Sequence, residues 1–540
     1  MHIVLTCSTR YLIVWLAFIV HFAVSGTAFA AAEHLVIAPL KDETQNVAPP
    51  PEQKEHSSLL VWRELEQPDL RHHAAVGTDA SAKAGNASNG AFSRETGAGK
   101  SYLIPALEIP GFIILLNAFD RVAFPDKEKN GEKVYSATLS TTWEHFRRQN
   151  WTFDKDGFDV NQFGHPYEGA TMFGLARSTG LNFWESFAYS NAGSFLWEMA
   201  GETTRPSIND LITTGTAGSL LGEALFRMAG FVLEDAGDSP GRWHKLATLA
   251  VSPPTAVNRH FFGDRFQNIY PSQRPATLWR LMAGGNFDLH ANNLSPIASE
   301  HDANLVADFS MSYGLPGKPG YTYKRPLDYF DLELLMRSDV SNVLESVTLC
   351  GLLLGTDYHL GSDYRGIWGL YGSYDYISPH LYRVSSTALS VGTTAQYWIA
   401  PGVALQGSVL GGLGFGAAGT ETASADERGY HYGATPQGLL SLSLLFGDVA
   451  MLDLSGRGYY VSTLGPDRSP GPEVVLRANV GVTFRVSGHH GIGIHYSESS
   501  RETRYKEMPH RYRSEGTVSV VYTFLSDTRF GAVEWRDGGS

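Results

Sequence analysis

The sequence predicts an α+β protein in which a small helical domain precedes a C-terminal antiparallel transmembrane β-barrel of about twelve strands. Three observations indicate this fold. The chain of 540 residues begins with an export signal. Residues 161–227 carry most of its helix start and stop signals, and the sequence from residue 277 onward alternates apolar and polar side chains over long segments.

The export signal occupies residues 1–30. Arg10 supplies the positive charge, residues 11–24 form the apolar core, and Ala28-Phe29-Ala30 is a cleavage site. An uncleaved anchor is the alternative, but the apolar run is shorter than the ~20 residues of a helical span. Export without a membrane helix leaves the periplasm, the outer membrane or secretion as destinations.

The composition suits a β protein and argues against a nucleic-acid partner. Aromatic residues make up 12%, glycine occurs 57 times, and charged residues make up 18%, below the usual quarter. The net charge is −13, whereas phosphate binding needs a basic surface. Cys7 lies in the signal segment, so Cys350 is the single cysteine of the mature chain. We therefore expect no disulfide and no thiolate metal cluster. We also expect no cofactor.

Four further segments follow the signal. Residues 31–100 are polar and are predicted to be a disordered leader. Residues 101–275 form the helical domain, 276–526 the barrel and 527–540 a tail.

The helical domain is predicted from residues that typically start and end helices. Helices are expected at residues 166–178, 183–203 and 208–233, with a short one at 111–119 and a loop over 234–275. The signals are Pro166 in a first turn, Gly180 as a stop, and the capping pairs Asn182–Glu185 and Ser207–Asp210. Gly218 and Gly222 would let another backbone approach the third helix closely.

The barrel is predicted from apolar and polar side chains that alternate with a period of two residues. Between residues 476 and 486 every even position is apolar, as at Leu476 and Phe484, while odd positions include Arg477 and Arg485. A soluble sandwich would also alternate, but long strands with one apolar and one charged side are typical of a barrel with lipid outside and water inside.

Short and long connections alternate near the C-terminus, as in outer-membrane barrels with short periplasmic turns and long outer loops. The short ones are residues 400–402, 447–448 and 488–490, and the long ones are 416–430, 463–472 and 499–513. Residues 315–325 are longer than such a turn should be.

Several fixed spacings occur together in the helical segment. Asp159–Tyr167 reads DVNQFGHPY and Pro206–Thr213 reads PSINDLIT, with Trp197-Glu198, Gly201-Glu202 and Gly222-Glu223 between and after them. This set resembles an uncharacterised envelope family of Gram-negative bacteria, known as domain of unknown function 3943. The resemblance covers roughly residues 102–270. It implies an exported protein with a β-rich C-terminal region and implies no activity.

The ionisable residues of the helical domain allow two interpretations. Glu198 and Glu202 are four apart, so a shared helix face would need partners, a cation or a raised pKa on one of them. In the first interpretation these glutamates and His165 form an acid/base or ligand-binding cluster. No H-E-x-x-H or G-x-S-x-G pattern specifies the chemistry, and no metal site is predicted.

The second interpretation is a structural ion-pair network that orders a glycine-rich bundle. Glu223 and Arg227 are four apart in the favourable order. Glu198 and Glu202 would then pair with arginines of the domain. The predicted network residues are Arg177, Asp210, Glu223, Arg227, Asn258 and Arg259.

We expect an outer-membrane barrel with a periplasmic or lumenal helical domain and a structural, plug or gated-conduit role. The alternative is an envelope hydrolase that acts on lipid or glycan through His165, Glu198 and Glu202. Expected partners are outer-membrane lipid, an envelope protein that the sequence does not identify, and lipopolysaccharide, which the basic residues 501–513 would contact.

Overall fold

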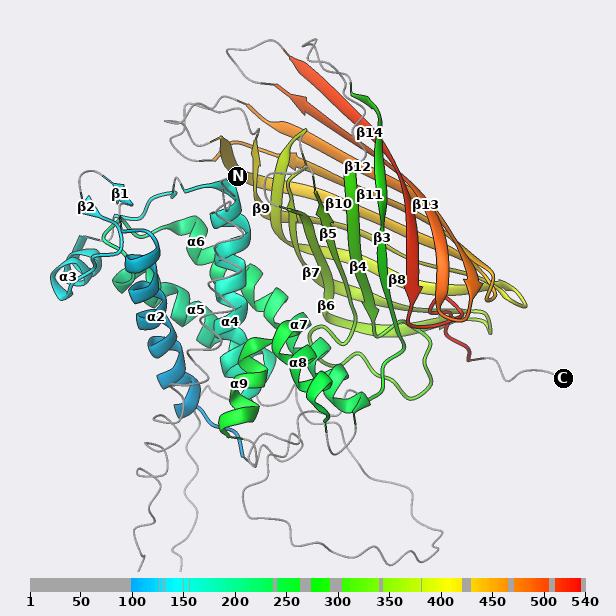
Figure 1. Cartoon of the computed structure of the whole chain (residues 1–540), viewed down its shortest axis with the longest axis horizontal. Coiled ribbons are helices and arrows are strands. Elements are labelled where there is room, and N and C mark those ends of the chain that lie inside the picture. The colour runs from blue at the N-terminus through cyan, green and yellow to red at the C-terminus, as the bar shows by residue number, and fades with distance from the viewer. Residues whose placement is uncertain are drawn as a thin grey trace, which may run out of the picture.

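The computed structural model describes most of the chain from residue 99 to residue 535. The gaps are residues 126, 130–131, 149, 155, 237–239, 263–272, 292–303, 339–342, 380, 420–428, 465–470 and 505–509. The predicted signal and almost all of the leader lie outside the described residues, as do the end of the tail and part of the basic segment 501–513. The described chain forms a helical domain beside a β-barrel (Figure 1).

The helical domain contains α-helices, two π-helical turns (η2 and η3) and one two-stranded hairpin. The elements are α2 (Leu103–Ala123), β1 (Glu128–Lys129), β2 (Glu132–Lys133), α3 (Leu139–Arg148), η2 (Val160–Gly164), α4 (His165–Ser178), α5 (Phe183–Ala200), α6 (Ile208–Ile212), η3 (Thr213–Ala217), α7 (Gly218–Asp235), α8 (Arg242–Val251) and α9 (Pro253–Phe261).

The three main predicted helices are present and start within one residue of their predicted starts, although the third is divided into α6, η3 and α7. Asn182 and Glu185 form a complete capping box at the start of α5. Gly180 has a φ of +93° just after α4, a conformation that favours glycine. However, α5 ends at Ala200, so Glu202 is not on this helix and shares no helix face with Glu198.

Two local predictions were wrong. The predicted short helix is part of α2, which runs through Pro110 because Ile104, Ile109 and Phe112 are buried on one side of it. Much of the predicted loop 234–275 is helical, since α8 and α9 lie in it. Pro253 begins α9, where the missing N–H of a proline costs nothing.

Two helical stretches have the length and apolar composition of a membrane span. They are Leu103–Ala123 and Ile208–Asp235, and most of the second is buried within the protein.

Twelve antiparallel strands form a closed barrel, as predicted, because β14 pairs with β3. The strands are β3 (Thr277–Ala291), β4 (Asn304–Tyr313), β5 (Phe330–Arg337), β6 (Leu344–Leu360), β7 (Tyr364–Ile377), β8 (Arg383–Ala400), β9 (Val403–Gly419), β10 (Tyr430–Phe446), β11 (Ala450–Val461), β12 (Glu473–Ser487), β13 (His490–Thr503) and β14 (Arg511–Leu525).

The barrel has two different ends. Tight turns join β6–β7, β8–β9, β10–β11 and β12–β13 at the end where β3 starts and β14 stops, which we call the short-turn end. The other connections are longer and lie at the opposite, long-loop end. Residues 314–329, between β4 and β5, are the exception, because this long connection lies at the short-turn end.

Side chains alternate between the outside and the lumen. On β12, Leu476 and Phe484 are exposed on the outer surface, whereas Arg477 and Asn479 line a cavity inside the barrel. The same alternation gives the other strands an apolar outer surface, which is the arrangement that a lipid environment requires.

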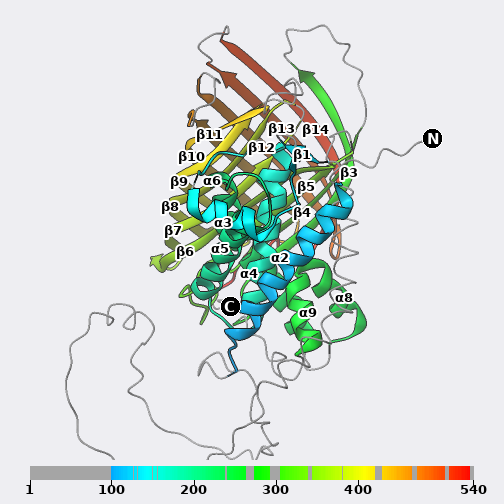
Figure 2. The ribbon, with the colours of Figure 1, turned by 90° about the vertical axis from the view of Figure 1, so that its left-hand side faces the viewer.

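The helical domain packs against the outer wall of the barrel, as Figures 1 and 2 show from two directions. On β7, Tyr374 and Tyr376 join the hydrophobic core of the helical domain. They share a strand face with Trp368, which is 59% exposed, while Asp375 between them points inward and binds Arg457. The expected lumenal position of the helical domain is therefore wrong, and so is its role as a plug of the lumen.

Candidate functional site

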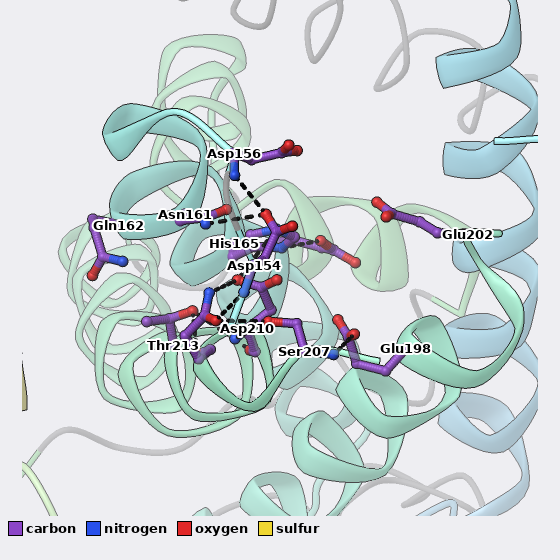
Figure 3. Close-up of polar contacts among 12 residues, drawn as sticks. Asp154, Asp156, Asn161, Gln162, His165, Glu198, Glu202, Ser207, Asp210 and Thr213 are labelled. Carbon is purple, nitrogen blue, oxygen red and sulfur yellow. Dashed lines mark hydrogen bonds and ion pairs between the residues drawn. The ribbon is translucent and has the colours of Figure 1, made fainter. Parts of the chain in front are cut away.

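His165 lies where the π-helical turn η2 joins α4, among buried polar side chains. Its Nδ1 is 3.3 Å from Glu168 Oε2 and its Nε2 is 3.7 Å from Asp210 Oδ1 (Figure 3). Both ring nitrogens therefore face carboxylates. Among the residues that the structure describes, no hydroxyl or thiol hydrogen-bonds to His165, so the cluster lacks the nucleophile that an acyl-transfer site needs.

The acidic surroundings favour the charged form of His165. Burial disfavours the imidazolium, but Asp210 and Glu168 outweigh this effect and raise the pKa of His165 well above its ordinary value. The imidazolium is thus one member of a buried charge cluster.

Glu198 and Glu202 do not bind the arginines. Glu198 accepts a hydrogen bond from the backbone N–H of Ser207 at 2.6 Å, and Glu202 accepts one from the Thr204 hydroxyl at 2.7 Å. Figure 3 shows Glu198 beside Ser207 and Glu202 some distance from both. Burial raises the pKa of each glutamate, because a buried carboxylate loses its hydration.

The arginines gather instead around Glu223, whose side chain is 0% exposed. Arg177 donates to Glu223 from Nε at 2.7 Å, and Arg227 donates from Nε at 2.8 Å. Arg177 also donates to the carbonyl of Leu181 at 2.7 Å. Two guanidinium groups thus share one buried carboxylate between α4 and α7, as a structural ion-pair network requires.

This network reaches the barrel through Arg227. Its Nη1 lies 3.0 Å from Asp328 Oδ1 and its Nη2 donates to the carbonyl of Pro326 at 2.7 Å. Asp328 also binds Arg325 and accepts from two backbone N–H groups. The long β4–β5 connection therefore docks the helical domain.

The remaining predicted network residues lie elsewhere. Asn258 on α9 donates to Ser178 Oγ at 2.8 Å and to the carbonyl of Leu175 at 3.2 Å, so it fixes α9 to the end of α4. Asp210 belongs to the His165 cluster. Arg259 is partly buried, and burial lowers its pKa.

The sequence did not reveal a docking function for Asn161 and Gln162. Asn161 Nδ2 donates to Tyr430 Oη at 2.9 Å, and Gln162 Nε2 donates to Tyr432 Oη at 3.1 Å. The Tyr374 hydroxyl donates to the carbonyl of Gln162 at 2.6 Å. The outward tyrosines of β7 and β10 gave no distinct signal, because tyrosines also form the aromatic girdles of membrane barrels.

The lumen holds a cavity of about 290 Å³. Its lining is polar and strongly charged, with ion pairs that cross between strands. Arg280 lies 2.8 Å from Asp453 and Arg477 lies 2.7 Å from Glu345. No group of three or more metal-binding side chains occurs in the described part of the chain.

The described part of the predicted tail enters the barrel at the short-turn end. Phe530 is 0% exposed and packs with Leu445 and Met451, whose side chains face the lumen, and it also lines the cavity. Gln406 donates to the carbonyl of Gly531 at 2.8 Å. The tail is thus part of the folded barrel.

Comparison with protein families matches one part of the chain. Residues 150–254 fit the family model described as "Domain of unknown function (DUF3943)". This agrees with the resemblance seen in the sequence. The DUF3943 segment runs from the approach to η2 to the start of α9, and it contains the His165 cluster, Glu223 and the residues that dock on the barrel.

Three solved structures are similar to part of the chain. The NanC porin has 8% identity over 45% of this chain and 98% of that chain, with a TM-score of 0.26. The channel DcaP of Acinetobacter baumannii has 8% identity over 46% and 96%, with a TM-score of 0.22. The translocator domain of the autotransporter NalP from Neisseria meningitidis has 15% identity over 46% and 87%, with a TM-score of 0.21.

None of the curated proteins compared with the chain matches it. The class of this protein follows from the barrel and not from these similarities. A closed antiparallel barrel satisfies its backbone hydrogen bonds without water, and here its outer surface is apolar. The chain is an outer-membrane β-barrel with a DUF3943 segment on its outer wall.

Proposed function

We propose that the protein is a gated conduit of the outer membrane, and that residues 527–535 form the gate at the short-turn end of the lumen. We call these residues the tail segment. The observation that carries the proposal is the burial of Phe530 inside the barrel mouth. A purely structural barrel has no need of a polar cavity that runs up to an inserted segment.

The tail segment is held by contacts that can be broken singly. Gln396 on β8 donates to the carbonyl of Val533 at 2.7 Å and accepts from its N–H at 2.9 Å. Gln406 on β9 donates to the carbonyl of Gly531. Such neutral hydrogen bonds contribute about 0.5–1.5 kcal/mol each. This is a modest barrier compared with unfolding any strand of the barrel.

The cavity leads away from the gate. Its lining includes Phe530 and Leu315 near the short-turn end, and Ser499 and Glu515 near the long-loop end. Charged and hydroxyl side chains lie between them. A hydrophilic solute that enters from the long-loop end would therefore meet a polar route that stops at the tail segment.

Conductance across planar bilayers tests the proposal. The full-length protein is expected to be closed for most of the time. Exchanging both Gln396 and Gln406 for alanine leaves the tail in the chain but removes its hydrogen bonds to these two side chains, so openings should become at least tenfold more frequent. The hydrogen bonds of the tail with Trp398 and Ser362 remain. Deleting residues 527–540 should give a permanently open pore.

A matched control is Ser526→Ala, which changes a neighbouring hydrogen bond to Trp279 N but leaves the tail contacts intact. It should behave like the parent protein. A barrel that remains closed after both changes to the gate, while it still migrates as a folded barrel, would refute the conduit.

A further inference from the structure

The four arginines that line the lumenal cavity are each bound to a carboxylate. Because every guanidinium group is already paired, these arginines do not offer a free cation for a solute. The pairs are Arg280–Asp453 at 2.8 Å, Arg337–Glu345 at 3.3 Å, Arg457–Asp375 at 2.7 Å and Arg477–Glu345 at 2.7 Å.

Two other lining carboxyl groups face each other without such a cation. Asp308 on β4 and Glu333 on β5 both line the cavity, and they are diagonal neighbours, because Glu333 pairs with Ser310, two positions from Asp308. Among the described residues, neither forms an ion pair with lysine, arginine or histidine. Arg280 and Arg477 are close enough to act on Asp308 electrostatically, but both are committed to the pairs above.

One oxygen of this pair lacks a donor. The side chain of Asp308 is buried, with 7% exposure, and its Oδ1 has no hydrogen-bond partner. A buried carboxylate oxygen without a donor is costly, because it has lost water and gained nothing in exchange. A ligand that brings both a positive charge and N–H donors would remove this cost.

We infer that Asp308 and Glu333 form a lumenal binding site for the protonated amine of a small solute. An ammonium group carries three donors and one charge, so it can bridge both carboxyl groups and reach Asp308 Oδ1. A divalent metal is a poorer fit, since the described residues hold no third ligand for it. An anion is excluded by the two acidic groups.

The size of the cavity limits the solute. At about 290 Å³ it lies just below the usual range for ligand pockets, so it suits a molecule of a few heavy atoms. The inference rests on the proposed conduit only in requiring that the solute reach the lumen from the long-loop end.

Binding is tested by isothermal titration calorimetry on the full-length protein in detergent, with 1,4-diaminobutane as the probe. The neutral analogue 1,4-butanediol has the same chain length. The variants are Asp308→Asn and Glu333→Gln. The matched control is Asp331→Asn, which removes the same charge from the same strand as Glu333, where Tyr329 and Ser312 already bind the carboxylate.

The diamine should bind saturably and the diol should not. Asp308→Asn and Glu333→Gln should each weaken binding at least tenfold, and Asp331→Asn less than threefold. An equal loss of affinity in all three variants would show that the diamine responds to the overall negative charge of the lumen and not to this site, and would overturn the inference. Failure of the parent protein to bind the diamine would also overturn it.

Calorimetry separates this inference from the gate. A barrel that binds the diamine but never conducts would refute the conduit and keep the amine site. A barrel that conducts after the tail is released, but whose lumen does not bind the diamine, would refute the amine site and keep the conduit.

Discussion

Arg227 of α7 binds Asp328 of the β4–β5 connection at 3.0 Å, and this buried ion pair joins the helical domain to the barrel. The same guanidinium also binds Glu223. One side chain therefore links the interior of the helical domain to the barrel wall, so the helices should lose their fixed position when it is removed.

Replacing Arg227 by methionine should destabilise the attachment by about 3–5 kcal/mol, because Asp328 and Glu223 each lose a buried partner. Limited proteolysis should then cut the helical domain while the barrel still shows heat-modifiable migration. The control is Arg325→Met, which removes the partly exposed partner of the same aspartate and should cost at most about 1 kcal/mol. Similar proteolysis of both variants would contradict the role given to Arg227.

Gly169 is the point where α4 approaches the turn η3 most closely. A Cβ placed there would lie 1.7 Å from the carbonyl oxygen of Thr214. Gly169→Ala should therefore destabilise the helical domain by about 1–3 kcal/mol or more. Gly230→Ala, on α7, meets no atom within 4 Å and should stabilise by about 0.5–1 kcal/mol. Thermal unfolding followed by circular dichroism at 222 nm measures both, and a harmless Gly169→Ala would show that the two segments can separate.

The sequence predicted this close packing in part. Gly218 and Gly222 were expected to admit another backbone, and a Cβ on Gly218 would indeed lie 2.6 Å from Gly169 Cα. The barrel was also predictable, because a period of two and alternating connections are local properties of the sequence. The position of the helices was not, because it depends on contacts between residues more than 200 apart, such as Asn161 and Tyr430.

His165 should make the helical domain more stable in mild acid. Its pKa is raised in the folded state, so its contribution is complete below its unfolded pKa of about 6.5 and is lost as the pH rises through the folded value. For one proton, the free energy of unfolding changes by at most about 1.4 kcal/mol per pH unit. The free energy of unfolding is measured between pH 6.5 and 8.5, and its dependence on pH should be weaker in His165→Gln than in the parent protein. An unchanged slope would assign the pH dependence to the buried carboxyl groups of Glu198, Asp210 and Asp120, whose raised pKa values act in the same direction.

Gln162 should be the most sensitive docking residue of η2. It holds Tyr432 through its amide, Ser385 through its side-chain oxygen and Tyr374 through its backbone. Gln162→Ala leaves the buried hydroxyls of Tyr432 and Ser385 without this partner, which should cost about 1–3 kcal/mol. Hydrogen exchange of η2 and α4 reports the loss. Asn191→Ala serves as a control for the amide-to-alanine change, because the Asn191 amide donates to the carbonyl of Phe187 within α5 and not to the barrel. Exchange that rises equally in both variants would exclude a specific docking role.

In the candidate site, the spacing of charged residues in the sequence did not predict their partners in the structure. Glu198 and Glu202 looked like a pair on one helix, but the helix ends between them and their partners are Ser207 and Thr204. Sequence spacing could not show that Glu223 would attract both arginines, since Arg177 is 46 residues away from it. The amine site in the lumen was equally hidden, because it joins two strands whose register no local pattern fixes.

The helices on the outer wall give the molecule a direction within the plane of the membrane. A bare barrel can meet a neighbour equally well from any side. Here strands β4–β10 are partly covered, while β11–β14 keep an apolar outer surface. Contact with a second barrel is therefore restricted to one arc of the circumference, so any array of these proteins would carry its helical domains on its outer edge.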